Sequence, residues 1–162
     1  MIIGFFRHGP AVPPGTRGIE DAKRSLTPEG REKTQAAARG VRRLELGFDR
    51  IVTSPLPRAV ETAEILAREL KLPRPVVSDR LLPGTVPRTM LQVVQEMTLK
   101  APVLVGHEPD LSAAVALLIG AREEESLEIK KAGLAVVQIR SVESTLAGTL
   151  LQLLSPSTLR LL

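Results

Sequence analysis

The segment IIGFFRHG occupies residues 2–9 and consists of a short apolar run that ends in Arg7, His8 and Gly9. A run of this length closed by a glycine is typical of a buried strand that ends in a tight turn. In open α/β sheets, ligands bind beyond the carboxyl ends of the strands. The sequence therefore predicts a strand over residues 2–6, with Arg7 and His8 at the ligand-binding edge of the sheet.

From this strand to Gly120, the chain alternates between strand and helix patterns. Residues 11–25, AVPPGTRGIEDAKRS, lack periodicity and are predicted to form a surface loop. Thr27, Pro28 and Glu29 then supply an N-cap, a proline at the first helical position and an acid near the helix dipole, which predicts a helix to about residue 45. Further strands are predicted at residues 50–53, 75–78 and 102–105, each followed by a helix. The apolar residues expected to face the core from these helices are Ala37, Val41, Leu44, Ala59, Ala63, Leu66, Leu70, Met90, Leu91, Val94, Met97, Leu111, Val115 and Leu118.

The pattern changes after Gly120. The segment AREEESLEIKKAG, residues 121–133, is charged. Its acidic run Arg122–Glu128, which becomes basic at Lys130 and Lys131, is predicted to be a solvated face. LAVVQIR and GTLLQLL, residues 134–140 and 148–154, resemble strands joined through SVEST. They predict a hairpin or an antiparallel edge. The whole pattern predicts one α/β domain over residues 1–162, a three-layer sandwich with a mostly parallel central sheet and an antiparallel C-terminal margin.

Composition excludes several classes of function. The chain has no Cys, so disulfides, thiolate catalysis and Cys-based metal sites are absent. Its net charge of +4 is modest and it has three Phe but neither Tyr nor Trp, so we expect no nucleic-acid partner. No apolar run approaches the roughly 20 residues that span a bilayer. We therefore expect a cytoplasmic protein without a membrane partner.

The chain has two histidines, and both follow predicted strands. His107 stands in Gly106-His107-Glu108-Pro109 after the strand at 102–105, as His8 follows the first strand, and Arg58 lies in the first turn of the helix after the second strand. Each residue alone has a structural explanation: a histidine packs, an arginine forms a surface ion pair, and Gly9 forms a turn. Together at one edge of the sheet, two imidazoles with Arg7 and Arg58 suit a phosphate dianion.

These segments resemble the histidine phosphatase superfamily, the phosphoglycerate mutase-like proteins, in order and spacing from residue 2 to about residue 115. The matching motifs are R7-H8-G9, L26-T27-P28-E29-G30, S54-P55-L56-P57-R58-A59 with T62-A63, and G106-H107-E108-P109. The short chain, K23-R24-S25-L26-T27, K131-A132-G133-L134-A135 and the terminal SPSTLRLL are similar to phosphohistidine phosphatases of the SixA type.

The resemblance implies a phosphatase that needs no metal or other cofactor. It implies that His8 is the nucleophile, which forms a phosphohistidine intermediate that water hydrolyses. It also implies that Arg7, Arg58 and His107 hold the phosphoryl oxygens, since positioning and electrostatics dominate phosphoryl transfer. Gly9 and Arg24 are candidate substrate-binding residues, although Arg24 fits a solvated surface position nearly as well.

The leaving group distinguishes the substrate classes. Many members of the superfamily carry a glutamate shortly after the third strand to protonate a departing alkoxide. When the motifs of this chain are aligned with those of the superfamily, Pro83 stands in the place of that glutamate. A phosphohistidine substrate expels an imidazole, so the missing acid predicts a phosphorylated protein partner, such as a phosphotransfer domain. The alternative is a phosphomonoesterase acting on a small phosphate ester, with Glu108 or Asp79 as its general acid. A protein that binds a phosphorylated partner without turnover is a third hypothesis.

Overall fold

The computed structural model describes residues 1–121, 127–142 and 145–162. Residues 122–126 of the predicted charged face, and residues 143–144 of the SVEST connection, therefore lie outside the described residues. Within the described part, no helix is both long enough and apolar enough to cross a membrane.

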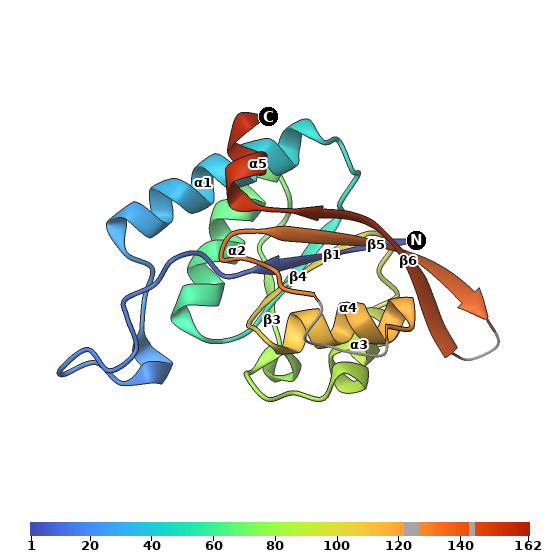
Figure 1. Ribbon diagram of the computed structural model, residues 1–162, viewed down its shortest axis with the longest axis horizontal. Helices are drawn as coiled ribbons and strands as arrows, with labels where there is room; N and C mark the ends of the chain where they lie inside the picture. Colours follow the sequence, from blue (N-terminus) through green and yellow to red (C-terminus); the bar gives the residue numbers. More distant parts are fainter. Residues whose placement is uncertain (122–126, 143–144) are drawn as a thin grey trace.

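A mixed sheet forms the centre of the molecule (Figure 1). Its strands β1 (Ile2–Arg7), β2 (Arg50–Thr53), β3 (Val76–Val77) and β4 (Pro102–Gly106) are mutually parallel. Strand β5 (Leu134–Val142) pairs antiparallel with β1, and β6 (Thr145–Leu154) pairs antiparallel with β5. The strand order among the described residues is β3-β2-β4-β1-β5-β6. The prediction of a mostly parallel sheet with an antiparallel C-terminal margin is confirmed.

Helices cover both faces of the sheet. Figure 1 shows α1 (Pro28–Arg43), α2 (Pro57–Leu70) and α5 (Pro156–Leu161) on one face, and α3 (Pro87–Glu96) and α4 (Asp110–Ile119) on the other. Each face of the sheet packs against its helices in a separate hydrophobic core. Phe6 of β1 lies in the core with α1, α2 and α5, and the adjacent Phe5 lies in the core with α3 and α4. Both rings are fully buried, as expected for a parallel strand covered on two sides.

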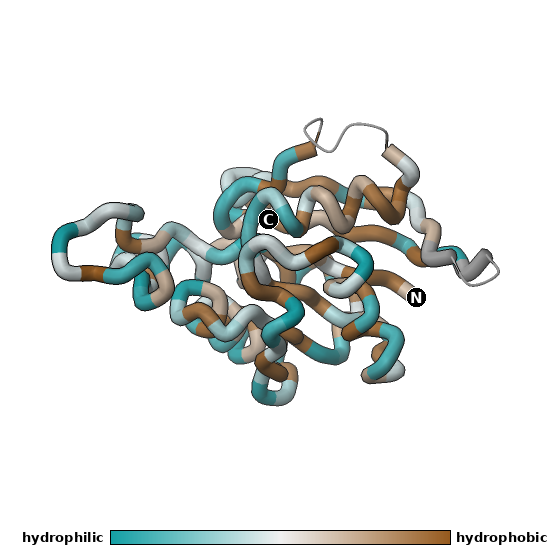
Figure 2. Tube along the Cα trace, turned by 90° about the horizontal axis from the view of Figure 1, so that it is seen from below, coloured by the Kyte–Doolittle hydropathy of each residue, from teal (hydrophilic) through white to brown (hydrophobic). Residues whose placement is uncertain are grey.

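The amino-terminal helix begins as the sequence predicts. The Thr27 hydroxyl accepts a hydrogen bond from the Gly30 amide at 2.9 Å, and Pro28 opens the helix. The long loop before it has one 3-10 turn, η1 (Asp21–Lys23), and projects at the left of Figures 1 and 2, where it is mostly hydrophilic. This loop carries residues of the site described below.

Three sequence expectations need correction. Met97 is not turned inward, because α3 ends at Glu96 and Met97 caps it with 37% of its surface exposed. The third strand is shorter than predicted, since β3 contains only Val76 and Val77. The terminal helix α5 was not predicted: its N-cap Ser155 and Pro156 are a recognisable start, but six residues are too few to establish a helical period.

Gly40 permits the closest approach between α1 and α5. A Cβ atom at Gly40 would lie 1.9 Å from the Leu159 carbonyl oxygen, which is backbone and cannot rotate away. We predict that Gly40→Ala lowers the free energy of unfolding by about 1–3 kcal/mol through overpacking. Denaturant unfolding with the exposed Arg39→Ala as control measures this, and equal stability of both variants would contradict the close packing.

Candidate active site

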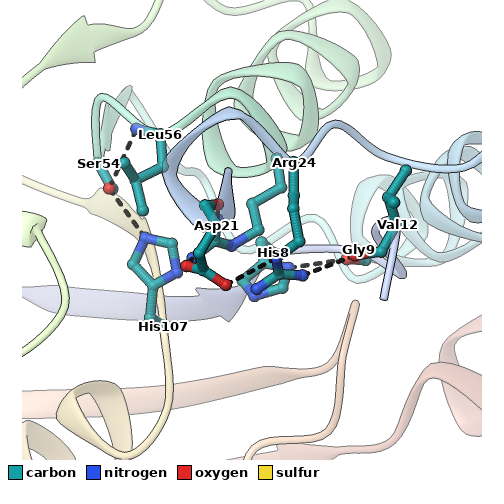
Figure 3. A network of polar contacts seen from close by, with 9 residues as sticks. His8, Gly9, Val12, Asp21, Arg24, Ser54, Leu56 and His107 are labelled. Atoms are coloured by element: carbon teal, nitrogen blue, oxygen red, sulfur yellow. Dashed lines mark hydrogen bonds and ion pairs between the residues drawn. The ribbon is translucent and has the colours of Figure 1, made fainter. Parts of the chain in front are cut away.

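The two histidines are brought together by neighbouring parallel strands. Arg7 at the end of β1 is in register with Gly106 at the end of β4, so His8 and His107 leave the sheet at the same level. Their ring centroids are 5.2 Å apart and their planes are inclined by 54°. Both residues are buried, with 6% and 4% of their surfaces exposed. The edge predicted from the strand pattern therefore holds both imidazoles (Figure 3).

The tautomer of His8 follows from its hydrogen bond. Its Nδ1 lies 2.8 Å from the Gly9 carbonyl oxygen, which only accepts, so Nδ1 donates and Nε2 carries the lone pair. The Gly9 amide in turn donates to the Thr62 hydroxyl at 3.0 Å, so the Gly9 carbonyl orients the His8 ring and its N–H is already engaged. A Cβ atom at Gly9 would lie 2.0 Å from Oγ1 of Thr34, which explains why this position requires glycine.

His107 is held from the opposite side of the site. Its Nε2 lies 2.8 Å from the Ser54 hydroxyl, at the end of β2. Its Nδ1 is buried and has no hydrogen-bond partner among the residues that the structure describes. A buried polar atom without a partner is costly unless a ligand satisfies it. Nδ1 of His107 is therefore a candidate contact for a bound anion.

Arg58 enters the site from the start of α2, as predicted. Its side chain is only 4% exposed, and its Nη1 donates to the Asp21 carbonyl oxygen at 2.9 Å. Arg24, which is 11% exposed, donates from Nε to Oδ1 of Asp21 at 2.8 Å and from Nη1 to the carbonyl of Val12 at 2.8 Å. Arg24 is thus built into the loop beside Arg58 and is not a freely solvated arginine.

Arg7 is fixed by the segment that precedes β5. Its Nη1 donates to the Ile129 carbonyl at 3.0 Å and lies 3.7 Å from a Glu128 carboxylate oxygen. Its Nε is buried without a partner among the described residues, as is Nε of Arg58. The guanidiniums are oriented by protein acceptors and keep donors free for an anion.

The two candidate general acids lie in different surroundings. Oε1 of Glu108 accepts from the Ser112 hydroxyl at 2.7 Å and from the Ile129 amide at 3.1 Å. Because the Ile129 carbonyl orients Arg7, Glu108 supports Arg7 through that residue. Asp79 is exposed at the start of the 3-10 turn η2 (Asp79–Leu81), and Pro83 is exposed in the loop that follows.

Burial keeps both imidazoles neutral. It lowers the pKa of His8 to about 4, with further lowering by Arg58, Arg7 and Lys131 and an opposing effect of the Gly9 hydrogen bond. Burial likewise lowers the pKa of His107 to about 3, helped by His8, Arg58 and Arg24 and opposed by Asp21. At neutral pH, the site therefore presents an unprotonated imidazole nitrogen among fixed cations, which suits nucleophilic attack on a phosphate.

Several residues of the site were not predicted from the sequence. Asp21, Ser54, Thr62, Ile129 and Lys131 contact or influence the predicted residues. The spacing of Asp21 and Arg24 permits an ion pair, but nothing in the sequence places it on Arg58. Among the described residues, no three His, Cys, Asp or Glu side chains are arranged to hold a metal ion.

Comparison with known proteins identifies the class. The sequence model of the histidine phosphatase superfamily (branch 1) matches residues 3–82. An uncharacterized protein of Picosynechococcus sp. is 37% identical over 145 residues, which are 87% of this chain and 86% of the relative. The chain therefore belongs to the histidine phosphatase superfamily, which identifies it as a phosphatase.

The fold is similar to that of SixA. The protein histidine phosphatase SixA, solved with tungstate, superposes with a TM-score of 0.84 at 24% identity and covers 98% of this chain and 99% of its own. The alpha-ribazole phosphatase of Shigella flexneri superposes with a TM-score of 0.74 at 19% identity, covering 96% of this chain and 97% of its own. The architecture is thus shared with phosphatases of different substrates.

The lowered pKa values predict an unusual titration. Both rings should remain neutral well below pH 6.5, because burial disfavours the imidazolium, and should take up protons only near pH 4 and pH 3. NMR titration of the two histidine rings measures this directly. Between pH 6.5 and about 4, the unfolded chain binds more protons than the folded one, so the free energy of unfolding should fall as the pH falls. A ring that titrates near pH 6.5 would contradict the buried site.

Proposed function

We propose that this phosphatase hydrolyses protein phosphohistidine through a phosphorylated intermediate on His8. The observation that carries the proposal is the hydrogen bond from Nδ1 of His8 to the Gly9 carbonyl, which leaves the lone pair on Nε2 of a ring whose centroid lies 5.2 Å from that of His107. A neutral imidazole needs no activating base at pH 7, so the low pKa of His8 supports the role of nucleophile.

The other site residues supply binding and charge stabilisation. In this proposal, Nε2 of His8 attacks phosphorus in line while Arg7, Arg58 and His107 donate to the phosphoryl oxygens. Within the described part of the chain, the Nε donors of both arginines and Nδ1 of His107 have no hydrogen-bond partner, which supports this assignment. Water then attacks phospho-His8, and the same donors stabilise the second transition state. Arg24 adds positive charge at the rim through its fixed position beside Arg58.

The lack of a well-placed acid supports a P–N substrate. The Asp79 carboxylate is exposed, and the Asp110 carboxylate accepts a hydrogen bond from the Gly84 amide beside Pro83 at 2.8 Å. The Glu108 carboxylate is engaged by Ser112 and Ile129. An alkoxide leaves slowly without a proton donor, whereas phospho-His8 itself already expels an imidazole in the second half of the reaction. A phosphohistidine substrate lets the same set of donors serve both halves.

One observation favours the phosphomonoesterase alternative. Burial raises the pKa of Glu108 despite its hydrogen bonds, which moves this carboxyl toward the protonated form that a general acid needs. The alpha-ribazole phosphatase among the similar structures also shows that the fold alone does not select the substrate. The acid role would require Glu108 to reach the leaving group while it holds Ile129.

The identity of the nucleophile can be tested by trapping. Rapid quenching during turnover should yield phosphate that is acid-labile and base-stable, and peptide mapping should place it on His8. We expect His8→Ala to reduce kcat by at least about 10³-fold, because no other group can form the intermediate. Its circular dichroism should match that of the wild type. Phosphate recovered on Ser or Asp would refute the mechanism.

A substrate panel with Glu108→Gln separates the two leading hypotheses. A glutamine oxygen can still accept hydrogen bonds from Ser112 and Ile129, so the support of Arg7 should persist. The variant lacks the ionisable carboxyl proton that a general acid donates. We expect kcat/KM for a phosphohistidine peptide to change by less than about threefold and to exceed that for sugar, nucleotide and cofactor phosphates. A loss of about 10²-fold or more confined to alkyl phosphates would establish the monoesterase instead.

A further inference from the structure

Asp21 is a partly exposed carboxylate beside Arg24 and Arg58. Its Oδ1 accepts from Arg24 at 2.8 Å and its Oδ2 lies 3.5 Å from Nη2 of Arg58, while its backbone carbonyl accepts from Nη1 of Arg58. Figure 3 shows its side chain beside His107. Asp21 and His107 also shift each other's pKa, which is consistent with this proximity.

Asp21 lies on the solvent-exposed side of the site, where a leaving group would depart. His8 and His107 are almost fully buried, whereas the Asp21 side chain is 62% exposed on the loop above them. In an in-line displacement, the leaving group departs on the side of phosphorus opposite the nucleophile. A phosphoryl group over His8 would therefore turn its leaving group outward, toward the level of Asp21.

Asp21 is suited to accept a proton-bearing group and unsuited to donate one. The hydrogen bond from Arg24, with the charges of Arg24 and Arg58, lowers the pKa of Asp21, so the group is ionised at neutral pH. An ionised carboxylate is acceptor-only and would repel a phosphate whose leaving group carries no donor. The protonated form of a phosphoimidazole does carry one, on the ring nitrogen that is not phosphorylated.

We propose that Asp21 is the leaving-group-binding residue of the site, accepting a hydrogen bond from the far ring N–H of the substrate phosphohistidine. This inference rests on the proposed function. Nε2 of His8 forms the new P–N bond, and the substrate P–N bond breaks with its electron pair kept by the departing ring nitrogen. The proton stays on the far nitrogen, so a protonated ring leaves as neutral imidazole. Without that proton, the ring would have to leave as an anion.

The carboxylate therefore selects the substrate class. It stabilises the protonated, reactive form of a phosphohistidine and orients its ring. A phosphate ester has no donor on its leaving group, so it forms no such hydrogen bond with Asp21. Arg24 and Arg58 hold the carboxylate in place, which preorganises it before the substrate binds. Asp21 is thus a specificity-determining residue that the motif pattern of the sequence did not reveal.

The test compares Asp21→Asn with the wild type on phosphoimidazole and on p-nitrophenyl phosphate, whose leaving group needs no proton. We expect kcat/KM for phosphoimidazole to fall by about 10- to 100-fold, as for the loss of a charge-assisted hydrogen bond. The value for p-nitrophenyl phosphate should stay within about threefold. The alkaline limb of the kcat profile with phosphoimidazole should move to lower pH, because the bound ring loses its proton more readily.

Glu20→Gln is the matched control, since it removes an equal charge from the same loop at an exposed residue paired only with Lys23. It should behave as the wild type on both substrates. Equal losses on both substrates in Asp21→Asn would mean that Asp21 only holds the arginines, and unchanged kinetics would mean that it does not touch the leaving group; both results overturn this inference alone. A wild type that hydrolyses phosphoimidazole no faster than alkyl phosphates would overturn the proposed function as well.

Discussion

The parallel pairing of β1 with β4 is the constraint on which the site depends. Because Arg7 and Gly106 are in register, the next residue of each strand, His8 and His107, leaves the sheet at the same height. A register shift of one residue would turn the side chains of one strand to the other face and separate the two rings. The buried residues of both strands, such as Phe5 and Leu104, fix that register through the core under α3 and α4.

The electrostatics of the site follow from burial under fixed cations. Solvent is excluded from both imidazoles, which lowers the pKa of each and keeps them neutral at neutral pH, while the arginines keep their charge. Each arginine is oriented by an acceptor from a distant part of the chain: the Ile129 carbonyl for Arg7 and Asp21 for Arg58. A neutral nucleophile and preorganised positive charge are the combination that phosphoryl transfer requires.

The loops, more than the sheet, differentiate the chemistry of this class. The sheet and its helices are shared with a protein histidine phosphatase and with an alpha-ribazole phosphatase, so they do not choose a substrate. Under the proposed function, two segments distinguish the substrate: the segment before α1, which contributes Asp21 and Arg24, and the loop after β3, which carries Pro83. The substrate proposal depends on these two segments.

The sequence by itself determined the order of strands and helices, the parallel sheet with its antiparallel margin, and the edge that gathers His8, His107 and Arg58. It could do so because buried strands and amphipathic helices have local periods, and because parallel strands end at one edge. Only the tertiary structure placed Asp21 on Arg58, Ser54 on His107 and Ile129 between Glu108 and Arg7. Those contacts join residues far apart in the chain through irregular loops. Their geometry depends on how the loops close over the finished sheet, which leaves no periodic signal in the sequence.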